Sequence, residues 1–167
     1  ISVKAINNED DTTYVSPAGI PDFDELNQVN SALSGPTPTK RKEQSLAVGY
    51  VLPAGSSVTA KSVSVSPMDF TPYGSIRFFL FGDGQGETFI FRAGSDNDYL
   101  EFTIPVTWSG WRQIFISQVD ITGDQKPDIW ENGAGNPATG TTQKVNSPNL
   151  ANVAQLVVGV ANNTAGT

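Results

Sequence analysis

The stretch SIRFFLFGDGQGETFIFRAGSDNDYLEFTIPVTWSGWRQIFIS, residues 75–117, decides the fold. It contains runs in which apolar and polar residues alternate, and Gly, Asp, Asn, Ser and Pro separate these runs. Alternation with a period of two over short runs is typical of half-buried antiparallel strands. We therefore expect the centre of the protein to be a β-sandwich.

Similar runs occur on both sides of this stretch. Each combines alternating apolar positions with turn residues at its ends, so each predicts a further strand. These runs are ISVKAI at 1–6, QSLAVGYVL at 44–52, VTAKSVSV at 58–65 and AQLVVGV at 154–160. The expected fold class is all-β: an antiparallel, jelly-roll-like β-sandwich of about eight strands.

Two long polar stretches, 7–42 and 120–152, interrupt the predicted strands. Loops of this length are unusual in a compact domain, so we expect the first to wrap the sandwich or to mediate contact. The length predicts a single domain over 1–167. Within it, we expect an N-terminal strand and wrapping loop at 1–42 and the sandwich core at 43–167.

The composition excludes several classes of function. The net charge is −7, from 10 basic and 17 acidic residues, which argues against nucleic acid as a partner. The basic cluster at 40–42 is expected to be a solvated loop.

No apolar run is long enough for a membrane helix, so we expect no membrane insertion by this chain. The beginning of the chain shows no signal peptide, and we expect that one was removed or that the chain is part of a longer protein.

Cysteine and histidine are both absent from the chain. Their absence removes thiol nucleophiles, Ser-His-Asp triads and the usual zinc sites. A Cys-free, acidic β-domain rich in Thr, Ser and Asn fits a bacterial secreted or surface protein.

Several short motifs stand out along the chain: YVSPAG at 14–19, EQSL at 43–46, FGDG at 81–84, FRAGSD at 91–96, WSGW at 108–111, PNLANV at 148–153 and GVANN at 159–163. Together they resemble a repeated module of the SprA family, large outer-membrane proteins linked to gliding motility and type IX secretion. The same core, with its Trp-x-x-Trp pattern, is also similar to galactose-binding-like jelly rolls, which include carbohydrate-binding modules. Both resemblances imply a non-catalytic domain at the cell surface, outside the cell or on the periplasmic side of the outer membrane.

The segment DITGDQKPDIWE, residues 120–131, is the strongest candidate for a metal site. Its oxygen-bearing residues have the spacing with which a short loop binds Ca²⁺, although Gln125 stands where the EF-hand pattern has Gly. The alternative is an acidic turn satisfied by its own backbone. The expected ligands are Asp120, Thr122, Asp124, the Lys126 carbonyl, Asp128 and Glu131. The acidic turns at 83–87 and 96–98 are weaker candidates.

The three tryptophans have different expected roles. Trp108 follows a Pro-containing loop and is a candidate platform for stacking a sugar, with a lid over the sandwich edge as the alternative. Trp111 begins an alternating run and is expected in the core, and Trp130 is expected to anchor the acidic loop.

A second candidate surface consists of the residues that alternate outward on the predicted strands. Phe79, Phe81 and Tyr99, flanked by Arg77 and Glu101, are expected to form an aromatic outer face. Such a face either binds a glycan or packs against the 7–42 segment or a neighbouring module.

The leading function is a non-catalytic structural or interaction module of a bacterial cell-surface or outer-membrane-associated protein. Its partners would be neighbouring modules of a larger surface protein. The alternative is a calcium-stabilised carbohydrate-binding module. Glycoside hydrolysis is a remote alternative, because no carboxylate pair is singled out by the sequence.

Overall fold

The computed structural model describes residues 2–7, 11–18, 44–119, 129–132 and 140–163; at 118, 119 and 129–132 it describes the backbone alone. Within these ranges the chain is all-β, and every strand pair is antiparallel. The predicted all-β antiparallel class is therefore confirmed. No helix among the described residues is long and apolar enough to cross a membrane.

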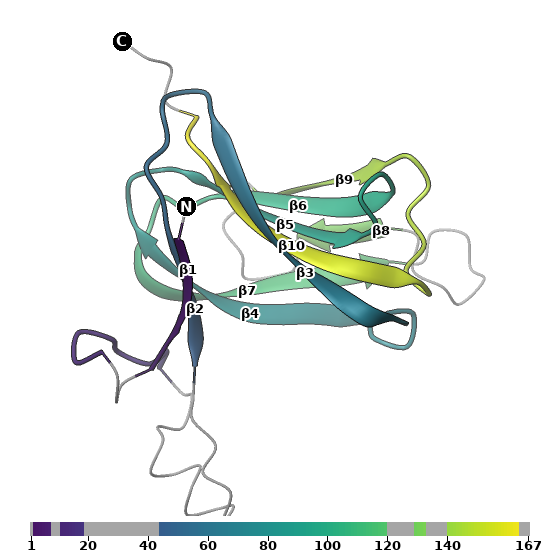
Figure 1. Cartoon of the computed structure of the whole chain (residues 1–167), viewed down its shortest axis with the longest axis horizontal. Coiled ribbons are helices and arrows are strands. Elements are labelled where there is room, and N and C mark those ends of the chain that lie inside the picture. The colour runs from purple at the N-terminus through teal and green to yellow at the C-terminus, as the bar shows by residue number, and fades with distance from the viewer. Residues whose placement is uncertain (1, 8–10, 19–43, 120–128, 133–139, 164–167) are drawn as a thin grey trace, which may run out of the picture. The chain divides into compact units, whose positions relative to one another are not determined.

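Ten strands are present in the described ranges (Figure 1). They are β1 (Ser2–Ile6), β2 (Ser45–Gly49), β3 (Ser57–Met68), β4 (Ser75–Asp83), β5 (Thr88–Gly94), β6 (Tyr99–Pro105), β7 (Ser109–Val119), β8 (Ile129–Asn132), β9 (Thr141–Val145) and β10 (Val153–Ala161).

The chain divides into two compact units, residues 1–51 and residues 52–167. In the first unit β1 pairs with β2, and the hydroxyl groups of Tyr14 and Ser45 lie 2.6 Å apart. The strand predicted at 44–52 thus pairs with β1 and joins neither sheet of the second unit. The single domain over 1–167 stays a prediction.

The second unit has a sandwich-like arrangement of two sheets. A five-stranded sheet has the order β3-β10-β5-β6-β9, and a three-stranded sheet has the order β4-β7-β8. Figure 1 shows the first sheet as one layer over β4 and β7. Each sheet therefore has one face toward the other sheet and one face that points outward.

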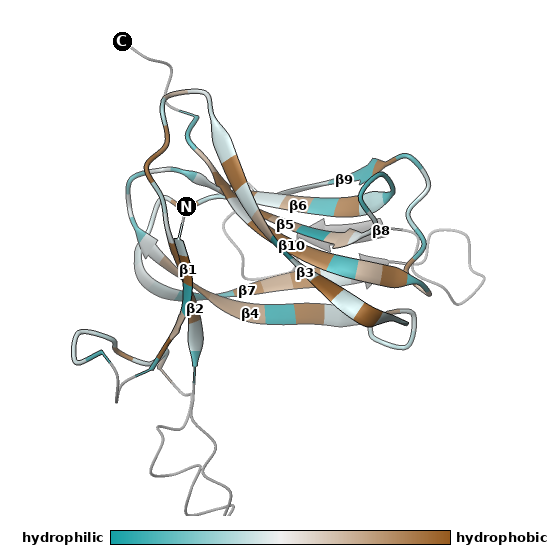
Figure 2. Cartoon of the chain, in the orientation of Figure 1, coloured by the Kyte–Doolittle hydropathy of each residue, from teal (hydrophilic) through white to brown (hydrophobic). Residues whose placement is uncertain are grey.

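The core forms where the inward residues of the two sheets meet. Leu100, Phe102 and Ile104 of β6 and Ile114 and Ile116 of β7 are at most 1% exposed. Burying one such side chain stabilises the fold by about 1.5–3 kcal/mol. Figure 2 shows brown and teal segments alternating along β4 and β10, as expected for strands with one buried face.

The register of β4 and β7 follows directly from this alternation. Ile76 pairs with Ile116 and Phe78 pairs with Ile114, and these four side chains all belong to the core or pack against it. Because successive side chains of a strand point to opposite faces, the residues between them point outward.

Candidate interaction surfaces

The outward face of β4 and β7 is rich in aromatic side chains. Three cross-strand pairs share it: Arg77 with Phe115, Phe79 with Gln113, and Phe81 with Trp111. We call these six residues the aromatic face. The structure thus brings together three of the predicted surface residues, Arg77, Phe79 and Phe81, and adds three from β7.

Specific ring contacts organise the aromatic face. The rings of Phe81 and Trp111 meet edge to face, with centroids 5.3 Å apart and planes at 76°. The Arg77 guanidinium carbon lies 4.6 Å from the centroid of the Phe115 ring. Phe81 nevertheless keeps 57% of its surface exposed. Contiguous exposed apolar patches mark interaction sites.

Tyr99 and Glu101 do not join this face. They lie on β6, which belongs to the five-stranded sheet, whereas Phe79 and Phe81 lie on β4 of the three-stranded sheet. The inward faces of both strands contribute to the core, so their outward faces point in opposite directions. The single surface expected from the sequence is therefore two surfaces on opposite sides of the sandwich.

Glu101 is the centre of a polar cluster on the second surface. Its Oε2 accepts a hydrogen bond from Arg92 Nε at 2.5 Å, and its Oε1 accepts one from Gln143 Nε2 at 2.5 Å. The Arg92 guanidinium carbon lies 4.8 Å from the Tyr99 ring centroid. We call Arg92, Tyr99, Glu101 and Gln143 the Glu101 cluster.

The sequence interpretation missed Arg92 and Gln143. Arg92 has a recognisable signal, since β5 and β6 form a hairpin around the 95–98 turn, and pairing outward from that turn places Arg92 opposite Glu101. Gln143 has no such signal, because β9 follows a long segment and its register with β6 is not encoded in a turn.

The structure reverses the expected placement of two tryptophans. Trp108 belongs to the core and is 7% exposed, whereas Trp111 is partly exposed on the aromatic face. The Arg112 guanidinium carbon lies 4.9 Å from the Trp108 ring centroid. In this conformation the Trp108 ring has no open face on which a sugar could stack.

Gly82 permits this position of Trp108. A Cβ atom at Gly82 would lie 2.3 Å from the Trp108 carbonyl oxygen and 2.7 Å from a methyl group of Val106. Only glycine allows such a close approach of backbone to backbone. The Trp108 Nε1–H group has no hydrogen-bond partner in the described part of the chain.

Most of the predicted calcium loop lies outside the described residues. This applies to Asp120, Thr122, Asp124, Lys126 and Asp128. The backbone of Glu131 lies in β8, where it pairs with Ser117 of β7. The described residues contain no group of three or more acidic side chains placed to hold a metal ion.

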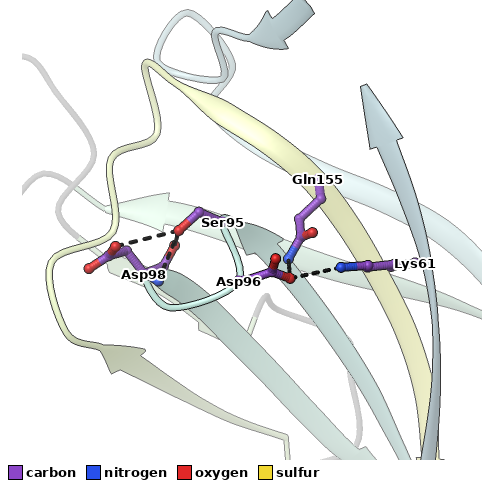
Figure 3. A network of polar contacts seen from close by, with 5 residues as sticks. All are labelled: Lys61, Ser95, Asp96, Asp98 and Gln155. Carbon is purple, nitrogen blue, oxygen red and sulfur yellow. Dashed lines mark hydrogen bonds and ion pairs between the residues drawn. The ribbon is translucent and has the colours of Figure 1, made fainter. Parts of the chain in front are cut away.

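The acidic turn between β5 and β6 uses its carboxylates for hydrogen bonds within the protein (Figure 3). Asp96 Oδ1 accepts from Lys61 Nζ at 2.9 Å and from Gln155 Nε2 at 3.1 Å. These donors hold the pKa of Asp96 below its usual value of 3.8, the Lys61 hydrogen bond most strongly. The backbone amide of Asp98 donates to Ser95 Oγ at 3.0 Å. The two hydrogen bonds to Asp96 join the turn to β3 through Lys61 and to β10 through Gln155.

Comparison of the chain with protein-family models, curated proteins and solved structures finds no match.

Proposed function

We propose that this chain is a non-catalytic interaction module of a bacterial cell-surface or outer-membrane-associated protein. Its contact surface is the aromatic face, and its partner there is a neighbouring protein module of similar composition. The observation that carries the proposal is the exposure of Phe81, which lies on the outward face of β4 beside Trp111 and is 57% exposed.

The chemistry of the aromatic face supports a protein partner. Aromatic residues and arginine are enriched at protein interfaces, and burying them removes apolar surface from water. Three of the six residues are phenylalanines and one is a tryptophan, and the aromatic face contains no acidic residue. In such a contact Phe81 and Trp111 would be the aromatic side chains that supply most of the binding energy.

Charge supports a partner of similar composition. Arg77 is exposed on the aromatic face, whereas the chain as a whole has a net charge of −7. A second acidic module would bring carboxylates to Arg77, which gives complementary potentials across the contact. The resemblance to the SprA family, in which such modules are repeated, agrees with this proposal.

The finer fold assignment is also a proposal. A jelly roll consists of eight strands in two sheets. The described part of residues 52–167 has eight strands, five in one sheet and three in the other, which supports this assignment.

Sedimentation equilibrium of the chain over a wide concentration range tests the proposed contact. We expect the average mass to rise toward that of two chains at the highest concentrations, because weak interfaces associate only there. Phe81→Ser should abolish this rise. Tyr73→Ser is the matched control, since Tyr73 is 61% exposed but lies outside the aromatic face.

Two results would contradict the proposal. One is a wild-type mass that does not change with concentration. The other is retention of the wild type on polysaccharide gels that is lost in Phe81→Ser, because the aromatic face would then bind a glycan.

A further inference from the structure

A row of paired side chains crosses the outward face of the five-stranded sheet. Lys61 of β3 pairs with Val157 of β10, and Val157 pairs with Arg92 of β5. Arg92 pairs with Glu101 of β6, and Glu101 pairs with Gln143 of β9. The row therefore places the Glu101 cluster at the β6–β9 end of the sheet, on the side opposite the aromatic face.

The ion pair of the cluster is buried to an unusual degree for an outward face. The side chains of Arg92 and Glu101 are 29% and 10% exposed. Removing charges from water costs free energy that their mutual attraction often fails to offset. A pair of apolar or threonine side chains would join β5 and β6 at lower cost. The ion pair therefore costs more free energy than an apolar pair would at the same position.

The cluster leaves hydrogen-bonding groups for a ligand. Arg92 uses only its Nε for the hydrogen bond to Glu101, and its two terminal nitrogens have no hydrogen-bond partner among the described residues. Gln143 is exposed, and its amide donates to Glu101 through one nitrogen. The hydroxyls of Thr103 and Thr141 lie 2.8 Å apart in the next row of the same face. Donors and acceptors thus lie side by side.

These groups match the hydroxyls of a neutral sugar better than they match a protein or an ion. The charges of Arg92 and Glu101 cancel, so the cluster does not select a charged ligand. Near the cluster, the apolar side chains of Ile90 and Val157 are each 7% exposed and offer little surface for a protein partner. Val63, which is 63% exposed on the same face, lies on β3 at the opposite edge of the sheet. Sugar hydroxyls both donate and accept, and Tyr99 adds an aromatic ring at the same place.

We propose that the Glu101 cluster binds a neutral polysaccharide along the outward face of β6 and β9. Arg92 and Gln143 donate to sugar hydroxyls, Glu101 fixes both donors in position, and Tyr99 packs beside a sugar ring. Adjacent strands lie about 4.8 Å apart, so the span from β5 to β9 is about 10 Å, which suits a short stretch of a glycan chain. This site is independent of the protein contact proposed for the aromatic face.

Affinity electrophoresis of the whole chain in gels containing neutral polysaccharides tests the site, with xylan, mannan, β-glucan and galactan as probes. We expect one of them to retard the wild type, and added salt to leave the retardation unchanged. Arg92→Lys keeps the charge but loses the planar fork of the guanidinium. Arg92→Lys and Gln143→Ala should each weaken binding about tenfold or more.

The matched control is Gln113→Ala, which makes the same change at an exposed glutamine on the aromatic face. This variant, and Phe81→Ser on the same face, should bind as the wild type does. Near-ultraviolet circular dichroism of each variant verifies that its fold is retained. Absence of retardation with all four polysaccharides would overturn the proposal. Retardation that survives Gln143→Ala but is lost in Phe81→Ser or by addition of salt would overturn it as well.

Discussion

The Trp111 ring meets the Phe81 ring edge to face across β4 and β7, with 5.3 Å between the centroids. This contact holds two large aromatic side chains on the outward face of the sheet, where the Phe81 ring stays 57% exposed. A pair of this kind stabilises by about 0.5–1.5 kcal/mol beyond the area that it buries. The two rings thus form an ordered surface before any partner is present, which reduces the entropy cost of binding.

Substitution of the two tryptophans should lower the stability by different amounts. Trp108→Ala removes a core side chain and should lower the free energy of unfolding by about 3–5 kcal/mol. Trp111→Ala removes a partly exposed ring and should cost about 0.5–1.5 kcal/mol. Urea denaturation of the two variants measures both values. A larger loss for Trp111→Ala than for Trp108→Ala would contradict their placement.

Gly82 should not tolerate a side chain. Gly82→Ala places a Cβ atom 2.3 Å from the Trp108 carbonyl oxygen, so the backbone has to shift, at a cost of about 1–3 kcal/mol. Gly74→Ala is the control, because a Cβ atom there meets no atom within 4 Å. Thermal unfolding should show a clear decrease for the first variant and little change for the second. Equal melting temperatures would show that Gly82 is not closely packed.

The hydrogen bonds to Asp96 predict a dependence of stability on pH. The pKa of Asp96 is lowered in the folded protein, so the unfolded chain takes up this proton first as the pH falls. The stabilisation is therefore complete above the ordinary pKa of 3.8 and is lost as the pH falls through the folded pKa. We expect Asp96→Asn to be less stable than the wild type near neutral pH and equally stable in strong acid.

The measurement is the melting temperature of both proteins across the acid range. Asp11 and Asp69, whose pKa values are also lowered by hydrogen bonds from nearby threonines, are present in both proteins and cancel in the comparison. A difference in melting temperature that is constant with pH would show that the Asp96 carboxylate does not contribute through its charge.

The sequence of residues 120–131 predicts stabilisation by calcium. Four carboxylates within this segment, from Asp120, Asp124, Asp128 and Glu131, repel one another without a cation. Calcium at about a hundred times its Kd would add about 2.7 kcal/mol if it binds only the folded state. We expect a higher melting temperature with millimolar Ca²⁺, reversed by EDTA and lost in Asp124→Ala. A melting curve that is the same with Ca²⁺ and with EDTA would leave this segment as an acidic turn.

The alternation of apolar residues predicts much of the second unit because alternation determines which face of a strand is buried. It predicts that Ile114 and Ile116 share a face, as they do in the core. It also predicts that Trp111 shares the opposite face with Phe115, although the position of Trp111 at the start of an alternating run suggests a place in the core. The alternation of the neighbouring residues, and not the start of the run, determines the face on which Trp111 lies.

The alternation of apolar residues does not determine to which sheet a strand belongs. Phe81 and Glu101 each point away from the core, and nothing in their strands shows that β4 and β6 belong to different sheets. Pairings between distant strands, such as β6 with β9, depend on the packing of the whole unit. The surface predicted from the sequence is therefore divided between two sheets, with Phe79 and Phe81 on one and Tyr99 on the other.

The most direct test of the proposed module is nuclear magnetic resonance of the chain at millimolar and micromolar concentrations. The account predicts that the indole signal of Trp111 and the ring signals of Phe79 and Phe81 shift with concentration, while the Trp108 indole signal does not. The Tyr99 signals on the opposite sheet should also stay unchanged. Signals of the aromatic face that are independent of concentration, or shifts confined to other surfaces, would contradict the claim that this face binds a neighbouring module.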